Sequence, residues 1–165
     1  MDKIKILFVC HGNICRSPMA EFVMKDMVRK RGLSELFEIS SAATSTEEID
    51  NPVYPPVRKL LGEKGLSCKG KTARQITRAD YGYYDYIIGM EQYNLRNMRY
   101  IFPEDTQNKI HLMLDFTDNP RDVSDPWYSG RYEEAFRDIC EGCEELLEKI
   151  VHELNGLNPL KTGDS

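Results

Sequence analysis

The chain has 165 residues, of which 41% are apolar and 30% charged, and its formal net charge is -5 at pH 7. This length fits a single domain with one hydrophobic core. The acidic balance gives no support to nucleic acid or an anionic membrane surface as a partner. Without a repeat or linker signal, we expect one domain over residues 1–154 and a frayed C-terminal tail over residues 155–165.

The N-terminal segment carries charged residues and then a short apolar run over residues 6–10. That run is too short to span a membrane, and no small-residue cleavage site follows it. The five cysteines are odd in number and widely spaced, unlike a secreted disulfide framework. The prediction is therefore a cytoplasmic protein without a membrane segment.

Four short segments, rich in β-branched or aromatic residues, are expected to form buried strands. They are separated by helical patterns, which predicts βαβ units and a parallel sheet covered by helices on both faces. The four segments are Ile4–Val9, Phe37–Ala42, Tyr86–Gly89 and Ile110–Leu114.

The first helix is expected over Ser17–Arg31, because Ser17 suits an N-cap and Pro18 suits the first helical position. Further helices are expected from Pro55 to near Gly65, in the turn that follows the capping-box pattern Thr77–Asp80, and over Glu91–Met98.

The longest amphipathic pattern starts at Tyr132 and ends at Leu154, and it predicts the last helix. Cys140 and Cys143 lie on its apolar face. A redox or zinc pair is the alternative, but no second Cys or His pair accompanies them, so packed core thiols are favoured.

The most informative stretch is Cys10–Pro18, which begins where the first strand ends and finishes where the first helix starts. Ligands bind at that edge of a parallel sheet, and the amides of a loop entering a helix form an anion site. Gly12 and Asn13 both tolerate a left-handed backbone, which lets the loop close into a cup. Arg16 adds a planar fork for two phosphate oxygens.

A thiol at the mouth of such a cup lies in a field that stabilises thiolate, and the Ser17 hydroxyl can donate a further hydrogen bond to it. Cys10 is therefore the predicted nucleophile, attacking phosphorus to form a phosphocysteine. Arg16 and the loop amides would stabilise the equatorial oxygens. The alternatives are a small buried Cys10 and a surface Arg16, and the position of the motif between strand and helix argues against both.

The leaving group of a phosphate ester needs a proton donor, and a carboxylic acid is suitable. Four candidates follow the fourth strand, and composition does not choose among them. They are Asp115, Asp118, Asp122 and Asp125.

The stretch Cys-x-Gly-Asn-Ile-Cys-Arg-Ser-Pro over Cys10–Pro18 closely resembles the active-site loop of the low-molecular-weight protein tyrosine phosphatases. The resemblance continues along nearly the whole chain, for example at Ser41–Ser45, Ala73–Gln75 and Ser124–Tyr128. It implies a single-domain α/β/α fold with a four-stranded parallel sheet, flavodoxin-like in the order 2-1-3-4. It also implies a two-step mechanism without metal or cofactor.

The resemblance also assigns roles to individual residues. It selects Asp125, which precedes Pro126 and two aromatic residues, as the general acid and then the base. The phosphate-binding loop would comprise His11, Gly12, Asn13, Ile14, Cys15 and Arg16, supported by Asn13, Ser17 and Ser41. Glu47, Trp127 and Tyr128 would line the substrate cleft, which a phosphotyrosine ring can cross and a short phosphoserine cannot.

Four positions depart from the family pattern, and His11 sits at a variable one. Trp127 stands where tyrosine is usual, and Glu47 where an aromatic residue is frequent, so that acidic peptides would be disfavoured. Lys71 replaces a common histidine, and Glu91 a common aspartate. His11 is expected to be non-catalytic, although its charge can tune Cys10.

Cys15 lies beside Cys10 in the loop, and the family resemblance implies a reversible disulfide between them under oxidant. The alternative is a packed thiol.

Three other activities fit the same residues less well. Arsenate reduction needs further cysteines on a mobile segment after the third strand, and residues 69–139 contain none. Phosphoarginine hydrolysis is expected with threonine where Ile14 stands. A non-catalytic anion-binding or redox-sensing module would leave Cys10 and Asp125 idle. The expected partners are phosphotyrosine proteins, including a bacterial tyrosine kinase, with inorganic phosphate as product.

Overall fold

The computed structural model describes residues 2–157, and its centre is a sheet of four parallel strands in the order β2-β1-β3-β4. The strands are β1 (Ile4–Cys10), β2 (Phe37–Ala43), β3 (Tyr86–Gly89) and β4 (Ile110–Leu112). The predicted parallel sheet and its order are confirmed.

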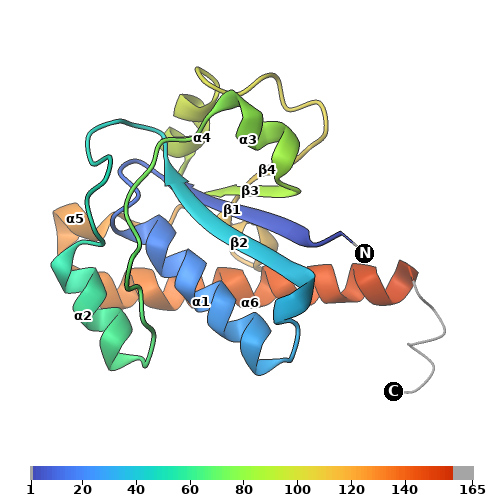
Figure 1. Cartoon of the computed structure of the whole chain (residues 1–165), viewed down its shortest axis with the longest axis horizontal. Helices are drawn as coiled ribbons and strands as arrows, with labels where there is room; N and C mark the ends of the chain where they lie inside the picture. Colours follow the sequence, from blue (N-terminus) through green and yellow to red (C-terminus); the bar gives the residue numbers. More distant parts are fainter. Residues whose placement is uncertain (1, 158–165) are drawn as a thin grey trace.

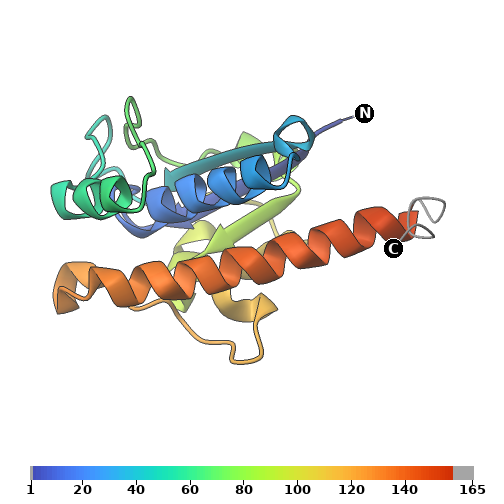
Figure 2. The same ribbon diagram turned by 90° about the horizontal axis from the view of Figure 1, so that it is seen from below.

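Helices cover both faces of the sheet, as the alternating pattern predicted (Figure 1). One face carries α1 (Arg16–Lys30), α2 (Pro55–Glu63) and the long α6 (Tyr132–Leu157). The other face carries α3 (Arg78–Tyr83) and α4 (Gln92–Met98). Figure 2 shows α6 running along the molecule beside α1, and the two helices pack against each other.

Strand β1 explains how the core divides into two halves. Successive side chains on a strand point to opposite faces. Ile6 and Phe8 are fully buried among residues of α1, α2 and α6, whereas Leu7 and Val9 are buried among residues of α3 and α4. Because β1 is buried on both faces, its end is fixed firmly, and Cys10 is its last residue.

The first helix differs from the prediction, which made Ser17 its N-cap. Helix α1 begins at Arg16 and has Cys15 at its N-cap position, with no side-chain capping bond. Ser17 lies inside the first turn because its hydroxyl group contacts Cys10 Sγ at 3.0 Å. Gly32 follows the helix with a φ of 70°, as a helix-ending glycine does.

The remaining elements follow the prediction with shifts at their ends. The capping box from Thr77 to Asp80 is present at the start of α3. β4 ends at Leu112, two residues early, because Asp115 Oδ2 accepts from the Leu112 amide at 2.9 Å and starts a 3₁₀ turn over Met113–Phe116. The short helix α5 (Pro126–Ser129) was not predicted.

The C-terminal part of the chain continues the last helix beyond its predicted end. α6 runs to Leu157, three residues into the segment expected to be a tail, and residues 158–165 lie outside the described part. On α6, Cys143 is fully buried and Cys140 is partly buried against the same core, as expected for packed thiols. Within residues 2–157, no helix has the length and apolarity needed to cross a bilayer.

Candidate active site

The loop from Cys10 to Arg16 joins the end of β1 to the start of α1, at the carboxyl edge of the sheet. The loop after β2 and helix α5 lie at the same edge (Figure 1). Adjacent parallel strands end together, so residues that follow β1, β2, β3 and β4 meet at this edge. The candidate site is built from all four of these connections.

Three donors surround the sulfur atom of Cys10. The amides of Asn13 and Ser17 point at Sγ from 3.3 Å and 3.4 Å, and Ser17 Oγ lies 3.0 Å away. Cys10 is only 4% exposed. These donors and the N-terminus of α1 place positive potential around the sulfur atom.

Asn13 gives the loop its shape. It has a φ of 60°, the left-handed conformation that asparagine tolerates better than most residues, and it is 1% exposed. Its Nδ2 donates to Ser17 Oγ at 2.8 Å and to Ser41 Oγ at 2.9 Å, while its Oδ1 accepts from the Arg74 amide at 3.2 Å. Gly12 tolerates the same conformation, but its φ is not positive.

The polarity of these hydrogen bonds follows from a buried carboxylate behind the loop. Glu21 is 4% exposed, and its Oε1 accepts from Ser41 Oγ at 2.5 Å. Ser41 therefore accepts from Asn13, and Asn13 donates to Ser17. The Ser17 hydroxyl hydrogen is then free to point at Cys10 Sγ.

Lys71 is one of two lysines paired with this carboxylate, since Lys25 Nζ also lies 2.6 Å from Glu21 Oε2. Lys71 Nζ lies 3.2 Å from Glu21 Oε1 and donates to the Ser41 carbonyl oxygen at 2.9 Å. Burial lowers the pKa of Lys71, although the adjacent Glu21 opposes that shift. Lys71, one of the departures from the family pattern, thus joins the support of the loop without facing the cleft.

Arg16 lies at the base of the site with 2% of its surface exposed. Its Nη1 donates to the Val123 carbonyl oxygen at 2.7 Å, and its Nη2 lies 3.3 Å from Glu91 Oε1 and 3.4 Å from Asp125 Oδ2. Burial lowers the pKa of Arg16, but the negative charges of Cys10, Asp125 and Glu91 outweigh it and raise the pKa above its usual value. The guanidinium is therefore a fixed cation.

Asp125 precedes helix α5 and caps it. Its backbone is extended, with φ -86° and ψ 109°, as a residue before proline should be. Its Oδ1 accepts from the Trp127 amide at 3.0 Å, which turns Oδ2 toward Arg16. An Asp N-cap, a proline at the first position and Gly130 with a φ of 73° are the ordinary signals of a short helix.

The predicted residues line one cleft of about 260 Å³, with three exceptions. Asn13, Ser17 and Ser41 lie behind the loop and not in the cleft wall. Cys15 is 7% exposed, and burial, together with the charge of Cys10, raises its pKa to about 12. The residues that line the cleft are Cys10, His11, Gly12, Ile14, Cys15, Arg16, Glu47, Glu48, Asp125, Trp127 and Tyr128.

Aromatic side chains stand at the mouth of this cleft. Trp127 is 51% exposed, and its ring centroid lies 4.8 Å from that of Tyr54 at the start of α2. Tyr128 is 86% exposed. Both side chains therefore have exposed surface for a ligand, and the Trp127 ring also packs against Tyr54.

Sequence reasoning missed several residues of the site. Glu91 stands out in the sequence only as a departure from the family pattern, yet it pairs with Arg16. Glu48, Glu21 and the Val123 carbonyl group were not predicted. These groups reach the loop only in the folded chain, so no local sequence motif marks them. For Glu48, the one available signal was its position next to Glu47, which was predicted to line the cleft.

Comparison with known proteins places the chain among phosphatases. The family model described as low molecular weight phosphotyrosine protein phosphatase matches residues 5–157. YfkJ of Bacillus subtilis, a low molecular weight protein-tyrosine-phosphatase, is 38% identical over 152 residues, covering 91% of this chain and 97% of the relative. The crystal structure of YfkJ superposes with a TM-score of 0.89 at 37% identity, over 93% of this chain and 98% of that chain.

Two further solved structures are also similar. A protein tyrosine phosphatase from Entamoeba histolytica, with Hepes in its active site, has a TM-score of 0.85 at 31% identity, over 92% of this chain and 99% of that one. A Drosophila arginine phosphatase has a TM-score of 0.81 at 30% identity, over 89% and 98% of the two chains.

The family match covers most of the chain, and the fold agrees with it. The chain belongs to the low molecular weight protein-tyrosine-phosphatase family and is a phosphatase of that family.

Proposed function

We propose that the chain hydrolyses phosphotyrosine through a phosphocysteine on Cys10. The observation that carries this proposal is the set of three donors around Cys10 Sγ, at 3.0 to 3.4 Å. A sulfur atom held by such donors, with the phosphate site beside it, is placed to act as a nucleophile.

Phosphate would be bound by Arg16 and by the loop amides. Among the described residues 2–157, the amide groups of Gly12, Ile14 and Cys15 have no acceptor in the protein. These donors belong to the loop that begins at Cys10 and enters α1, where the helix dipole adds positive potential. Together with the Arg16 fork, they would stabilise the equatorial oxygens during transfer.

The first chemical step transfers the phosphoryl group to sulfur. The sulfur electron pair of Cys10 forms the S–P bond while the P–O bond to tyrosine breaks, and Asp125 gives its proton to the leaving phenolic oxygen. In the second step Asp125 takes a proton from water, the water oxygen bonds to phosphorus, and the S–P bond breaks. Inorganic phosphate and the Cys10 thiolate are the products, so the cycle needs no cofactor.

Tyrosine is the favoured phosphoryl carrier over arginine. Ile14 is 8% exposed and packs in the core cluster beneath the loop, which leaves an apolar floor where the arginine-specific branch is expected to carry threonine. Trp127 and Tyr128 at the mouth supply aromatic surface for a phenyl ring.

The function is tested with para-nitrophenyl phosphate, a phosphotyrosine peptide and a phosphoarginine peptide. The wild-type chain should hydrolyse the first two and not the third, and Cys10→Ser should be inactive on all three. Full activity of Cys10→Ser would show that Cys10 is not the nucleophile. Hydrolysis of the phosphoarginine peptide faster than that of the phosphotyrosine peptide would show that phosphotyrosine is not the preferred substrate.

We further propose that oxidant pairs Cys10 with Cys15. Peroxide would oxidise the Cys10 thiolate to a sulfenic acid, and the Cys15 thiol would then displace water to form the disulfide. Both side chains line the same cleft. The cytoplasmic location remains a prediction from the sequence, and the tyrosine kinase partner remains a prediction from the family resemblance.

A further inference from the structure

Carboxylate side chains outnumber arginine and lysine side chains in the lining of the cleft. Its lining contains the carboxylates of Glu47, Glu48 and Asp125, but Arg16 is the only arginine or lysine among the described residues that line it. Arg16 is buried at the base, where it faces the phosphate position, whereas Glu47 and Glu48 lie on the loop after β2. A bound phosphotyrosine would therefore have its phosphate beside the Arg16 cation and its neighbouring peptide residues near the carboxylates of Glu47 and Glu48.

Glu47 is held over the phosphate-binding loop. Its Oε2 lies 2.6 Å from His11 Nε2, while 67% of its side chain remains exposed. The loop is also tied at the backbone, since Ser45 donates to the His11 carbonyl oxygen through both its amide, at 3.1 Å, and its hydroxyl, at 2.9 Å. The Glu47 carboxylate thus has a defined place at the rim and an open side toward a ligand.

Glu48 is fixed next to it by different contacts. Its Oε2 accepts from Asn51 Nδ2 at 2.6 Å, and its side chain lies against the Gly12 backbone, where a Cβ added to Gly12 would be 3.3 Å from Glu48 Cγ. Neither carboxylate is paired with a lysine or an arginine within residues 2–157. The partner of Glu47 is the His11 ring, which carries a positive charge only when it is protonated.

We propose that Glu47 and Glu48 select phosphotyrosines flanked by lysine or arginine and reject those flanked by acidic residues. This inference rests on the proposed phosphotyrosine hydrolysis and names the class of substrate. Exposed charge pairs are individually weak and are screened by salt. Each matched pair is therefore expected to change kcat/KM by about two- to fivefold, with a larger effect when two flanking positions are charged.

The test uses three phosphotyrosine peptides that are identical except for two flanking residues, which are lysine, glutamine or glutamate. The wild-type chain at low ionic strength should show kcat/KM in the order lysine, glutamine, glutamate, with about tenfold or more between the extremes. The ratio of kcat/KM for the lysine peptide to that for the glutamate peptide should fall toward one at about 0.5 M salt, because the Debye length is then only a few ångströms.

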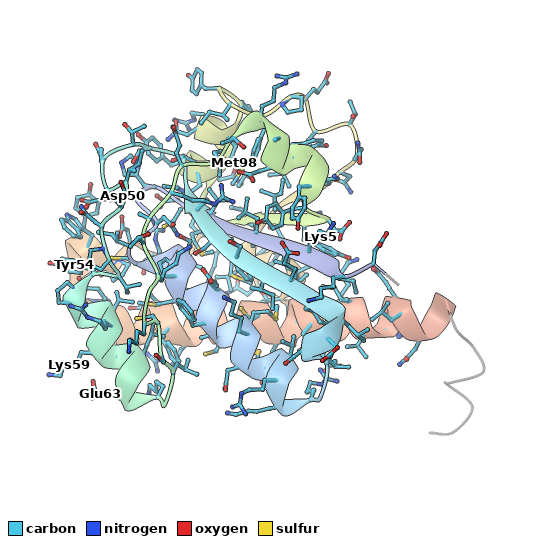
Figure 3. All side chains as sticks on the ribbon, in the orientation of Figure 1. Lys5, Asp50, Tyr54, Lys59, Glu63 and Met98 are labelled. Atoms are coloured by element: carbon cyan, nitrogen blue, oxygen red, sulfur yellow. The ribbon has the colours of Figure 1, made fainter. Side chains whose placement is uncertain are left out.

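Glu47→Lys places a cation at the rim and should erase or reverse the order. The ratio of the lysine to the glutamate peptide is read within each variant, so a general loss of activity does not affect it. Glu63→Lys is the matched control, since it makes the same change of net charge on an exposed residue. Glu63 lies at the far end of α2, away from Asp50, which belongs to the same loop after β2 as Glu47 (Figure 3). The ratio in Glu63→Lys should equal that of the wild-type chain.

The outcomes separate this inference from the function on which it rests. Hydrolysis of all three peptides at equal rates, or an unchanged ratio in Glu47→Lys, would overturn the selection by charge and leave the phosphatase proposal intact. No hydrolysis of any peptide would overturn the proposed function itself. A shift in Glu63→Lys as large as that in Glu47→Lys would assign the preference to net charge and contradict the role of the rim.

Discussion

Arg16 Nη2 lies 3.4 Å from Asp125 Oδ2, so the guanidinium that would bind phosphate also holds the proposed acid. The two groups belong to different connections of the sheet, one after β1 and the other after β4. A phosphate dianion on Arg16 would compete with Asp125 for the same cation. The bound phosphate would then lie beside the carboxyl group that donates the proton in the proposed first step.

Replacing Asp125 by asparagine should lower kcat by about a hundredfold or more, because the leaving oxygen would lose its proton donor. The loss should be greater for phenyl phosphate than for para-nitrophenyl phosphate, whose leaving group needs little protonation. Asp118→Asn, in the same loop but outside the cleft lining, is the control. Equal rates for Asp125→Asn and the wild-type chain would move the acid role to another carboxylate.

Replacing Glu91 by glutamine should lower kcat/KM about tenfold, because a hydrogen bond to a charged group contributes about 1.5–3 kcal/mol. The glutamine still offers an oxygen to cap α4, so the melting temperature should change little. Steady-state kinetics and thermal melts measure the two effects. Glu91→Asp keeps the charge and should have an activity between those of Glu91→Gln and the wild-type chain. Activity equal to wild type in Glu91→Gln would deny that Glu91 positions Arg16.

Asn13→Ala and Asn13→Gly separate backbone shape from hydrogen bonding. Both remove the three side-chain hydrogen bonds to Ser17, Ser41 and the Arg74 amide. Only alanine adds the cost of a left-handed backbone, about 1 kcal/mol. Urea unfolding should show a loss of about 2–4 kcal/mol for alanine and about 1 kcal/mol less for glycine. Equal stability of the two variants would contradict the strain at this position.

Cys15 predicts a pH dependence of stability. Its pKa is raised from 9.0 to about 12 in the folded chain, so between these values the unfolded chain has lost the thiol proton and the folded chain has kept it. The free energy of unfolding therefore falls as pH rises, by up to about 1.4 kcal/mol per pH unit from this group. Below a pH of about 9 the contribution is fully present.

The measurement is urea unfolding of the wild-type chain and Cys15→Ser at a pH of about 8.5 and about 10.5, on either side of the unfolded-state pKa. The wild-type chain should lose more stability over this interval than the variant, since the other cysteines titrate in both. Parallel losses would show that Cys15 is not protected from ionisation by its burial.

Gly142 is the site of a packing prediction on α6. A Cβ at this position would lie 2.6 Å from the Met113 carbonyl oxygen, so Gly142→Ala should destabilise the chain by about 1–3 kcal/mol despite the better helix propensity of alanine. Gly156→Ala, on the same helix with no atom within 4 Å, should leave stability unchanged or raise it by up to about 1 kcal/mol. Thermal melts compare the two, and a stabilised Gly142→Ala would contradict the close approach.

Most of the fold could be predicted because β1 is a continuous apolar run and α6 carries a strong helical period. The site loop was also predictable, since Cys10, Asn13 and Arg16 lie within one strand-to-helix junction. The start of α1 was misplaced because Ser17 satisfies the local rule for an N-cap, while the fold turns its hydroxyl group to Cys10. Glu91 and Val123 join Arg16 only after three strands have paired, so no local pattern marks them.

The burial of β1 on both faces has a consequence for how this enzyme can diverge. Moving the backbone of Cys10 would require breaking the sheet. The amide hydrogens of β1 should therefore be among the slowest in the chain to exchange with solvent. Most residues of the loop after β2 and of helix α5 are exposed at the surface. Substitutions can accumulate there and alter which peptides are accepted while the reacting centre keeps its shape.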